Sequence, residues 1–403
     1  MPRRVVIIGA GQAGRRTAEA LRDLDAEAEI LLLGEEPHPP YDRPPLSKAV
    51  LLGTDPGASL FVRTAEFYAE RRIGLRTATP VVALDLATRQ AATAAGERIG
   101  YDSLVLATGA RARRLSVPGA DDPRVRTLRT LEDAEALHAA LAARPRVAVV
   151  GGGLIGLEVA AAARQSGCAV TMLEAADRLM ARCVPPAISD LYAALHRGHG
   201  VVLHLGAAVG RIVPRPDGLL LDAGAVQVTA DLVVAGIGGI AETALAEAAG
   251  LAVRDGILTD ESGRTSHPDV YAAGEVARFA QPWFEHSVRL EAWQVAQQQP
   301  AAVARAICGQ PGGYAELPWH WTDQFGRNLQ VLGTPEPEFE LIQRPAEGGR
   351  LTAIAVDTAG RARGAVLLDN GREATPLRRL IAAGKSLDVT ALRDSGTPLR
   401  RFL

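Results

Sequence analysis

The sequence twice places the spacing G-x-G-x-x-G directly after an apolar stretch, in RRVVIIGAGQAG and again in PRVAVVGGGLIG. In this spacing the first glycine permits a tight turn, the second lets a phosphate approach the backbone, and the third lets a helix pack close to its strand. The N–H groups and the dipole at the start of that helix attract phosphate. The pattern predicts two dinucleotide sites, built on Gly9, Gly11 and Gly14 and on Gly151, Gly153 and Gly156. Cofactor contacts are also expected from other residues of these loops, namely Ala13, Leu154 and Ile155.

Each glycine motif continues into a second apolar stretch that ends in an acid, Glu35 in the first copy and Glu174 in the second. Both acids follow at close to the roughly 20-residue spacing of the dinucleotide fingerprint, where a carboxylate accepts hydrogen bonds from an adenosine ribose. Either acid alone would equally suit a solvated strand end, but the paired context favours the ribose. A dehydrogenase that acts directly on its substrate needs only one dinucleotide, so two sites favour FAD beside NAD(P)H.

A third chemical feature is Lys48, which lies in the proline-rich segment PHPPYDRPPLSKAV. Among the 44 Lys and Arg residues of the chain, Lys48 and Lys385 are the two lysines. The lysine ammonium is a compact point charge that the planar guanidinium of arginine does not replace. Prolines fix φ and reduce the entropy that a loop loses on ordering, so they suit a loop that must hold a charge in one place. The plain alternative is a solvated loop lysine.

The composition limits the classes of protein to be considered. A net charge of −2 argues against nucleic-acid binding, which usually shows a basic excess. No apolar run reaches the roughly 20 residues of a membrane helix, and the strand pattern by Val5 leaves no room for a signal peptide, so we expect a soluble cytoplasmic protein. The three cysteines, Cys168, Cys183 and Cys308, form no C-x-x-C pair and no metal-ligand cluster, so no metal site is expected.

The elements that must position these residues alternate between strands and helices, which predicts an α/β fold with two Rossmann-like units. Between the glycine motifs, YDSLVLATGA (residues 101–110) reads as an apolar strand that closes on small residues, and TSHPDVYAAGEVARF (residues 265–279) reads similarly. After Pro335 the pattern changes to antiparallel strands followed by a helix near residues 373–385, which indicates a C-terminal α+β domain.

In combination and in order, several segments resemble the FAD-dependent, NADH-using ferredoxin reductases that serve bacterial oxygenases. The matching segments are GAGQAG, YDRPPLSK, LVLATGA, LRTLEDAEAL, VVGGGLIGLEVA, AGIG, YAAGEVA and PWHWTDQFGRNLQVLG. The resemblance covers essentially the full length and implies a glutathione-reductase-like architecture. It implies a discontinuous FAD domain over residues 1–113 and 249–325, an NAD domain over residues 114–248 and a C-terminal α+β domain over residues 326–403.

The resemblance also implies roles for individual residues. Lys48 would lie beside the flavin isoalloxazine and stabilise negative charge on the reduced ring, with Glu158 as the partner that orients it. For Glu158 a surface carboxylate is an equal alternative. Arg43 would lie near the adenine half of FAD and Arg129 near its phosphates, and Glu275 stands where the family usually has Asp. Further cofactor contacts are expected from Val81, Thr108, Gly109, Gly238, Glu291, Trp293 and Trp321. Trp319 is expected in the core, and the loop after Gly238 lacks a proline common in relatives.

The implied activity is hydride transfer from NADH to FAD, followed by single-electron transfer to a [2Fe-2S] ferredoxin that supplies a cytochrome P450 or a Rieske-type oxygenase. A monomer is the default expectation for this family. One alternative is a non-catalytic, regulatory flavoprotein that resembles apoptosis-inducing factor. Disulfide and peroxide reductases of the same fold are disfavoured, because they need a cysteine beside the flavin and residues 1–167 contain none.

Overall fold

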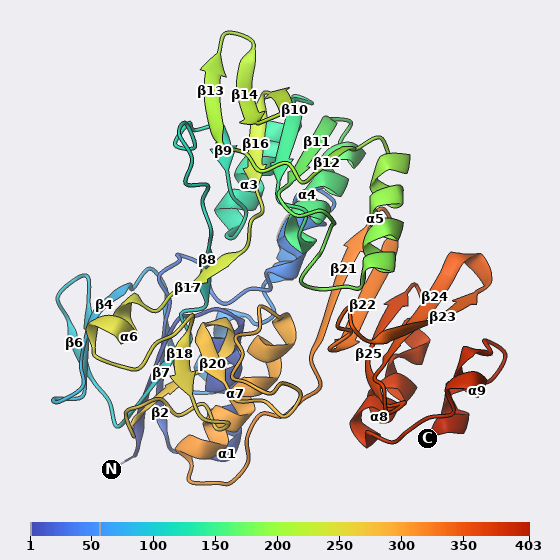
Figure 1. Cartoon of the computed structure of the whole chain (residues 1–403). Helices are drawn as coiled ribbons and strands as arrows, with labels where there is room; N and C mark the ends of the chain where they lie inside the picture. The colour runs from blue at the N-terminus through green and yellow to red at the C-terminus, as the bar shows by residue number, and fades with distance from the viewer. Residues whose placement is uncertain (1, 56–57) are drawn as a thin grey trace. The chain divides into compact units, whose positions relative to one another are not determined.

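The computed structural model describes residues 2–55 and 58–403, whose elements are shown in Figure 1. Its described residues divide into two compact units. Unit 1 comprises Met1–Arg43, Gly57–Arg111 and Gly239–Glu316, and unit 2 comprises Pro44–Pro56, Ala112–Gly238 and Leu317–Leu403. The segment that carries Lys48 belongs to unit 2. The expected boundaries of three separate domains stay a prediction.

Unit 1 is built on a five-stranded parallel sheet in the order β19-β7-β1-β2-β3. Its strands are β1 (Arg4–Ile8), β2 (Glu29–Leu33), β3 (Ile73–Arg76), β7 (Ser103–Leu106) and β19 (Val270–Ala272). The central strand β1 is a continuous apolar run because both faces of a parallel sheet are covered, and Val5, Val6 and Ile7 are fully buried. Helices α1 (Gln12–Leu24) and α7 (Trp293–Ile307) pack against each other.

Smaller elements complete unit 1. Short helices are α2 (Ala65–Glu70) and α6 (Ala244–Ala248), with 3-10 turns η2 (Ala58–Leu60) and η3 (Gly274–Val276). An antiparallel sheet contains β4 (Val81–Asp85), β5 (Gln90–Thr93) and β6 (Arg98–Gly100). Two-stranded sheets are formed by β8 (Ala110–Ala112) with β17 (Gly239–Ala241) and by β18 (Ile257–Thr259) with β20 (Ala277–Phe279).

Unit 2 contains a second five-stranded parallel sheet in the order β12-β11-β10-β16-β9. Its strands are β9 (Val125–Arg126), β10 (Arg146–Val150), β11 (Ala169–Glu174), β12 (Val202–Leu205) and β16 (Leu232–Ala235). Its helices are α3 (Leu131–Leu141), α4 (Leu154–Gln165) and α5 (Pro186–Gly198). An antiparallel sheet of β13 (Arg211–Arg215), β14 (Gly218–Ala223) and β15 (Val226–Ala230) follows, and the Lys48 segment contributes the turn η1 (Pro44–Ser47).

The C-terminal part of unit 2 is a five-stranded antiparallel sheet in the order β21-β22-β25-β24-β23. Its strands are β21 (Trp319–Gln324), β22 (Arg327–Gly333), β23 (Glu340–Ala346), β24 (Arg350–Val356) and β25 (Ala362–Leu368). Helices α8 (Ala374–Ala383) and α9 (Val389–Arg393) follow, with turns η4 (Glu347–Gly349), η5 (Gly371–Glu373) and η6 (Leu399–Phe402). The sequence-based expectation of an α/β fold with two Rossmann-like units and a C-terminal α+β region is therefore confirmed.

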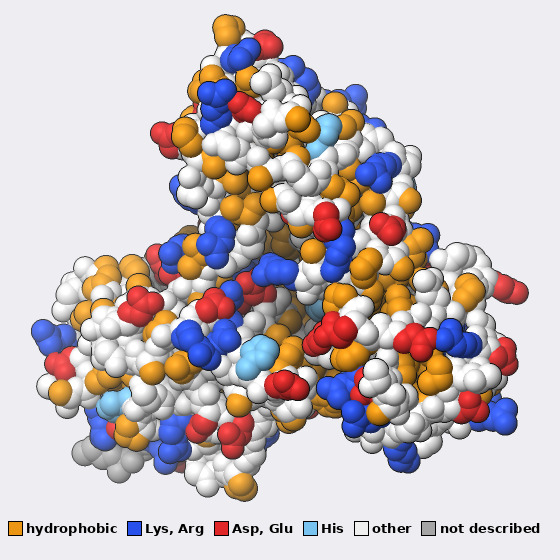
Figure 2. All heavy atoms as spheres, in the orientation of Figure 1, with side chains coloured by type: hydrophobic (Ala, Val, Ile, Leu, Met, Phe, Trp, Pro, Cys, Tyr) orange, Lys and Arg blue, Asp and Glu red, His pale blue; other side chains and the backbone are white. Residues whose placement is uncertain are grey.

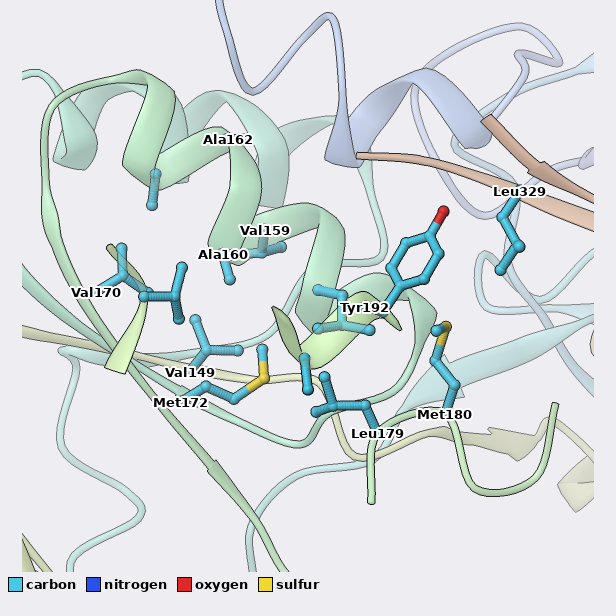
Figure 3. Close-up of a cluster of buried hydrophobic side chains, with 14 of the residues drawn as sticks. Val149, Val159, Ala160, Ala162, Val170, Met172, Leu179, Met180, Tyr192 and Leu329 are labelled. Atoms are coloured by element: carbon cyan, nitrogen blue, oxygen red, sulfur yellow. The ribbon is translucent and has the colours of Figure 1, made fainter. Parts of the chain in front are cut away.

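One hydrophobic core joins the second parallel sheet to the antiparallel sheet within unit 2. It combines side chains of α4 and β10 with Tyr192 of α5 and with Leu329 and Val331 of β22. Figure 3 shows part of this core, with Tyr192 and Leu329 among the drawn side chains. Because α4 contacts both β21 and η1, polar side chains on these three elements can meet in a dry environment.

Candidate active site

The first glycine motif forms an open cradle at the start of α1. A Cβ atom on Gly9 would lie 2.2 Å from the Ala107 carbonyl oxygen, and one on Gly14 would lie 1.9 Å from the Gly9 carbonyl oxygen. Backbone packing therefore requires glycine at both positions, and Gly9 also has a φ of 105°. At Gly11, by contrast, an added Cβ would meet no atom within 4 Å. No side chain caps α1, so this open cradle fits a dinucleotide phosphate.

The acidic residues after β2 have different surroundings. Glu35 is exposed beyond the end of the strand. Glu36 accepts hydrogen bonds from Arg43 Nη2 at 2.5 Å and from the Tyr41 hydroxyl at 2.6 Å. The ring centroid of Tyr41 lies 6.2 Å from those of His38 and Phe61. The structure thus places Arg43 within an aromatic and acidic cluster in the same unit as the first cradle.

Several expected flavin contacts of unit 1 lie around this cradle. The turn η3, which carries Glu275, approaches the start of α1 closely, since a Cβ on Gly274 would lie 2.6 Å from that of Ala13. The Thr108 hydroxyl donates to the Glu242 carbonyl at 2.7 Å, and the Glu242 N–H donates to the Gly109 carbonyl at 2.9 Å. These two bonds fix the turn that follows β7.

The remaining expected contacts of unit 1 have other partners. Glu291 pairs with Arg289 at 2.7 Å. Trp293 lies in the first turn of α7, and its indole N–H donates to Asp42 at 3.4 Å. Val81 is half-buried at the start of β4. The roles of these three side chains as cofactor contacts stay predictions.

The second glycine motif repeats the geometry of the first in unit 2. A Cβ on Gly151 would lie 2.5 Å from the Gly236 carbonyl oxygen, and one on Gly156 would lie 2.1 Å from the Gly151 carbonyl oxygen. Gly153 faces open space, since an added Cβ would approach no atom closer than 4.0 Å. The side chain of Ile155, in the first turn of α4, is 46% exposed. This cradle also fits a dinucleotide phosphate, with Leu154 and Ile155 at its edge.

The ribose-binding candidate of the second motif, Glu174, is held in one orientation. Its carboxylate accepts the N–H of Gly152 and, at 2.7 Å, the N–H of Ala176. The nearest following basic residue, Arg178, donates to the carbonyls of Val184 and Ala181 and to the Ser189 hydroxyl at 2.7 to 3.0 Å. The Arg178 guanidinium is therefore engaged in hydrogen bonds to the segment that follows it. Gly238, at the opposite side of the motif, has a φ of 100°.

Lys48 forms an ion pair with Glu158, with Lys48 Nζ 2.9 Å from Glu158 Oε1. The Lys48 side chain is 21% exposed, whereas that of Glu158 is 3% exposed. Glu158 also accepts the hydroxyl of Ser47 and, at 2.6 Å, the hydroxyl of Thr322. A carboxylate this deeply buried requires such partners, because desolvating an unpaired charge is costly. Glu158 is thus a buried acceptor on α4 and not a surface carboxylate.

Trp321 directly precedes Thr322 on β21 and stacks on Trp319, with ring centroids 4.9 Å apart and planes inclined by 19°. Trp319 was expected in the core, but it is only half-buried. Its indole donates to Gln330 at 3.2 Å, and the Arg378 guanidinium lies over its ring. Arg129, expected near phosphates, precedes Thr130, the N-cap residue of α3, and its backbone N–H donates to Asp133 at 2.9 Å.

Comparisons with known proteins place the chain in a family. Residues 3–300 match the family described as pyridine nucleotide-disulphide oxidoreductase, and residues 319–403 match the reductase C-terminal family. The chain belongs to the pyridine nucleotide-disulphide oxidoreductase family. The ferredoxin–NAD(+) reductase component of the anthranilate 1,2-dioxygenase system of Burkholderia cepacia is 42% identical over 400 residues, covering 99% of this chain and 98% of that protein. Putidaredoxin reductase of Pseudomonas putida is 37% identical, covering 95% of this chain and 97% of that protein.

Solved structures agree with this family membership. The covalent complex of putidaredoxin reductase with putidaredoxin has a TM-score of 0.94 and 35% identity, covering 99% of this chain and 98% of that chain. A ferredoxin reductase from Rhodopseudomonas palustris gives the same TM-score and identity, covering 99% of each chain. The family resemblance inferred from the sequence motifs is therefore confirmed.

The cysteines, possible metal ligands and helix lengths of the described residues bear on the expectations from the sequence. Cys168, Cys183 and Cys308 are free thiols, and burial raises the pKa of Cys168 and Cys308. Within residues 2–55 and 58–403, no group of three or more His, Cys, Asp or Glu side chains is arranged to hold a metal ion. In the same described ranges, no helix is both long and apolar enough to span a membrane.

Sequence reasoning missed two polar partners of Glu158, Ser47 and Thr322, and the side chains that extend the network from Thr322, Gln324 and then His196. A signal was available for two of them. Thr322 and Gln324 are two residues apart on a strand, so they share one face, and both are buried. Two polar side chains with this spacing next to apolar strands indicate an internal hydrogen-bond network.

Proposed function

We propose that this chain is an NADH-dependent ferredoxin reductase that carries FAD. The observation that carries the proposal is the presence of two open dinucleotide cradles in a chain that matches ferredoxin–NAD(+) reductase components from end to end. Bound FAD would accept the electron pair of an NADH hydride and return the electrons singly to a [2Fe-2S] ferredoxin. That ferredoxin would supply a cytochrome P450 or a Rieske-type oxygenase, and we propose the cytoplasm, which supplies NADH, as the location.

The first cradle is the proposed FAD site. Gly9, Gly11 and Gly14 would admit the pyrophosphate, and Glu35 would accept the hydroxyls of the adenosine ribose. The cluster around Arg43 would enclose the adenine half, and the side chain of Glu275 would accept a hydrogen bond from the ribityl chain. The remaining FAD contacts proposed are Ala13, Val81, Thr108, Gly109, Arg129, Trp293 and Trp321.

The second cradle is the proposed NADH site. Gly151, Gly153 and Gly156 would admit the pyrophosphate, with Leu154, Ile155, Gly238 and Glu291 as further contacts. Glu174 already holds a fixed orientation through two backbone N–H groups, so its carboxylate would meet the 2′-hydroxyl of NADH without rearrangement. A 2′-phosphate would meet a like charge there, and Arg178 is bound to its own loop. The site therefore favours NADH over NADPH.

Lys48 is the proposed catalytic cation. A fixed ammonium stabilises negative charge as it develops on the reduced flavin, and it acts most strongly where the site excludes water. The bond to Glu158 limits the positions of the ammonium. Glu158 therefore orients Lys48, and the two residues act as a unit.

The test is reduction of a ferredoxin by the purified, FAD-loaded protein. With NADH as the donor, we expect bleaching of the visible absorbance of putidaredoxin or of the anthranilate-system ferredoxin under anaerobic conditions. A protein whose flavin is reduced by NADH but which reduces no member of a panel of [2Fe-2S] ferredoxins would instead support the regulatory flavoprotein alternative.

A further inference from the structure

An uninterrupted chain of hydrogen bonds runs inside unit 2 from helix α5 through strand β21 to Glu158. His196 Nε2 lies 2.7 Å from Gln324 Oε1, Gln324 Nε2 lies 2.9 Å from Thr322 Oγ1, and Thr322 Oγ1 lies 2.6 Å from Glu158 Oε1. All four side chains are at most 4% exposed. This series of hydrogen bonds thus connects α5, β21 and α4, which are far apart in the sequence.

The carboxylate of Glu158, at the end of this series of hydrogen bonds, decides which atom donates and which accepts in every bond. A carboxylate has no hydrogen to offer, so the single hydroxyl hydrogen of Thr322 must point to Glu158. Thr322 then has only lone pairs left for Gln324, which must present its NH2 group to Thr322 and its oxygen to His196. His196 must therefore carry its hydrogen on Nε2. All donors of the chain point toward Glu158.

The protonation state of His196 agrees with a hydrogen on Nε2. Burial lowers its pKa to about 4, so the imidazole is neutral near pH 7 and has one N–H group. Among the residues that the structure describes, His196 Nδ1 has no hydrogen-bond partner. A hydrogen on Nδ1 would be a buried donor without an acceptor, which costs free energy. The Nε2–H form therefore makes the bond to Gln324 and leaves a lone pair, not an N–H group, unpaired at Nδ1.

Aromatic packing also holds the end of β21 at the C-terminal end of α5. Phe325, at the tip of the hairpin between β21 and β22, has a φ of 51°, which is strained for a side chain of this size. Its ring stacks on His199 with centroids 3.9 Å apart and meets the His196 ring edge-on at 5.0 Å. Contacts with His196 of α5 and with His199, the residue directly after α5, thus hold the hairpin tip in place, and with it Gln324 and Thr322.

We propose that Thr322, Gln324 and His196 are positioning residues that hold the Glu158 carboxylate, and through it the Lys48 ammonium, for hydride transfer to the flavin. The inference rests on the role proposed above for Lys48. Glu158 Oε1 accepts both Thr322 and Lys48, so the lone pair left for the ammonium depends on where Thr322 places its hydrogen. Without that bond the Ser47 hydroxyl alone restrains the carboxylate, on its other oxygen, so the carboxylate turns more readily about its last torsion and the ammonium follows it.

The structure offers a closely matched control for Thr322 in the same sheet. Thr352 of β24 is likewise fully buried, donates its hydroxyl to the carboxylate of Glu373 and accepts the Asn370 side-chain NH2 at 2.8 Å. Replacing either threonine by valine removes one buried hydroxyl from an equivalent amide–hydroxyl–carboxylate chain. Only the Thr322 chain ends on the partner of Lys48.

The test measures anaerobic reduction of the bound flavin by NADH in a stopped-flow instrument, without ferredoxin. In Thr322→Val the rate at saturating NADH should fall about tenfold, the effect expected when a charged acceptor loses one hydrogen bond, while the apparent Kd for NADH stays unchanged. Thr322→Ser should restore the rate. Thr352→Val should lower the melting temperature as Thr322→Val does and leave the rate unchanged.

Two further readouts separate positioning from a general loss of packing. In a Lys48→Met background, Thr322→Val should cause no additional slowing, because the two residues act through one contact. In ¹⁵N-histidine NMR spectra of the FAD-loaded protein, His196 should show an Nε2–H signal that shifts in Thr322→Val but not in Thr352→Val.

Equal slowing by the two valine variants, or full additivity with Lys48→Met, would overturn the proposal. So would an unchanged rate in Thr322→Val, or a parent flavin that NADH does not reduce. Failure to reduce any ferredoxin would refute the proposed partner only, since none of these measurements uses a ferredoxin.

Discussion

At the scale of single residues, charge and its fixation decide what the site can do. Lys48 has a neighbouring carboxylate, Glu158, which is itself bound by two hydroxyls. The acid that faces the second dinucleotide, Glu174, is fixed by backbone N–H groups. In both places the group that would meet the cofactor is oriented before any cofactor arrives, which reduces the entropy lost on binding.

The first prediction concerns Lys48. Lys48→Met should retain FAD but slow flavin reduction by NADH by at least about tenfold, and it should lower the flavin midpoint potential, because reduced flavin loses a stabilising charge. Stopped-flow absorbance and a redox titration measure the two effects. Lys385→Met, at the other lysine of the chain, is the control and should match the parent. A Lys48→Met rate equal to that of the parent would contradict the assigned role.

The second prediction concerns nucleotide choice. The parent should prefer NADH strongly, and Glu174→Ala should weaken that preference by about tenfold, since the loss of one charge-assisted hydrogen bond is of that order. The ratio of kcat/KM for NADH and NADPH measures it, with a dye as electron acceptor. Asp177→Ala, which removes an exposed acid three residues further on, should leave the ratio unchanged. Equal kcat/KM values in the parent would refute this assignment.

At the scale of elements, each strand–turn–helix unit contains one glycine that backbone packing requires and another that borders the open space of the cradle. In the first unit, Gly14 is needed for contact between the helix α1 and the turn before it, whereas Gly11 borders open space. The same contrast holds between Gly156 and Gly153 in the second unit. Folding and ligand binding thus depend on different glycines of one motif.

A third prediction follows from this separation. Gly14→Ala should destabilise the protein by about 1 to 3 kcal/mol or prevent folding, because the new methyl group overlaps the Gly9 carbonyl. Gly11→Ala should fold with a melting temperature near that of the parent apoprotein but should bind FAD more weakly. Thermal unfolding of the apoprotein and flavin titration measure these outcomes. If Gly11→Ala bound FAD as tightly as the parent, the first cradle would not be the pyrophosphate site.

The contact between α5 and β21 supports a fourth prediction, on pH. The folded-state pKa of His196 is about 4, below its ordinary value of 6.5, because burial disfavours the charged imidazolium by more than the Gln324 hydrogen bond favours it. The unfolded chain therefore binds more protons between these pH values, and stability falls as the pH drops from 6.5 to 4, by about 3 kcal/mol in total from this residue.

Urea unfolding at a series of pH values checks this effect, with His196→Gln as the comparison. The substituted protein should lose less stability than the parent over the same pH range. His320, whose pKa burial also lowers to about 4, should keep its contribution in both proteins. Parallel stability curves for the two proteins would contradict a buried neutral His196.

At the scale of the whole molecule, surface charge is mixed. Figure 2 shows Lys and Arg side chains interspersed with Asp and Glu over the visible face. Several arginines are held in ion pairs: Arg289 with Asp255 and Glu291, Arg327 with Asp369, and Arg393 with Glu340. The C-terminal segment carries further basic residues, among them Arg379, Lys385, Arg400 and Arg401.

The fifth prediction concerns the electron partner. If a basic surface guides an acidic ferredoxin, reduction of the ferredoxin should slow severalfold between about 0.05 and 0.5 M ionic strength, because salt screens exposed charges. NADH-dependent reduction of a neutral dye should change little. The Arg400→Gln/Arg401→Gln double variant should have a higher KM for ferredoxin and an unchanged dye rate. Ferredoxin turnover that is indifferent to salt would exclude steering of this kind.

The sequence by itself determined the two Rossmann-like units, their order and the family, because strand–glycine–helix patterns record local backbone requirements that nearby residues satisfy. It also singled out Lys48, since one of two lysines in an arginine-rich chain, placed in a proline-rich segment, is visible in the sequence. The tertiary structure alone decided what Glu158 is. From the sequence it could be a surface carboxylate or a partner of Lys48, and only the packing of α4 against η1 and β21 buries it among Ser47, Lys48 and Thr322. Those donors lie more than a hundred residues from Glu158 along the chain, and no local pattern encodes which buried donors will meet a carboxylate across such a separation.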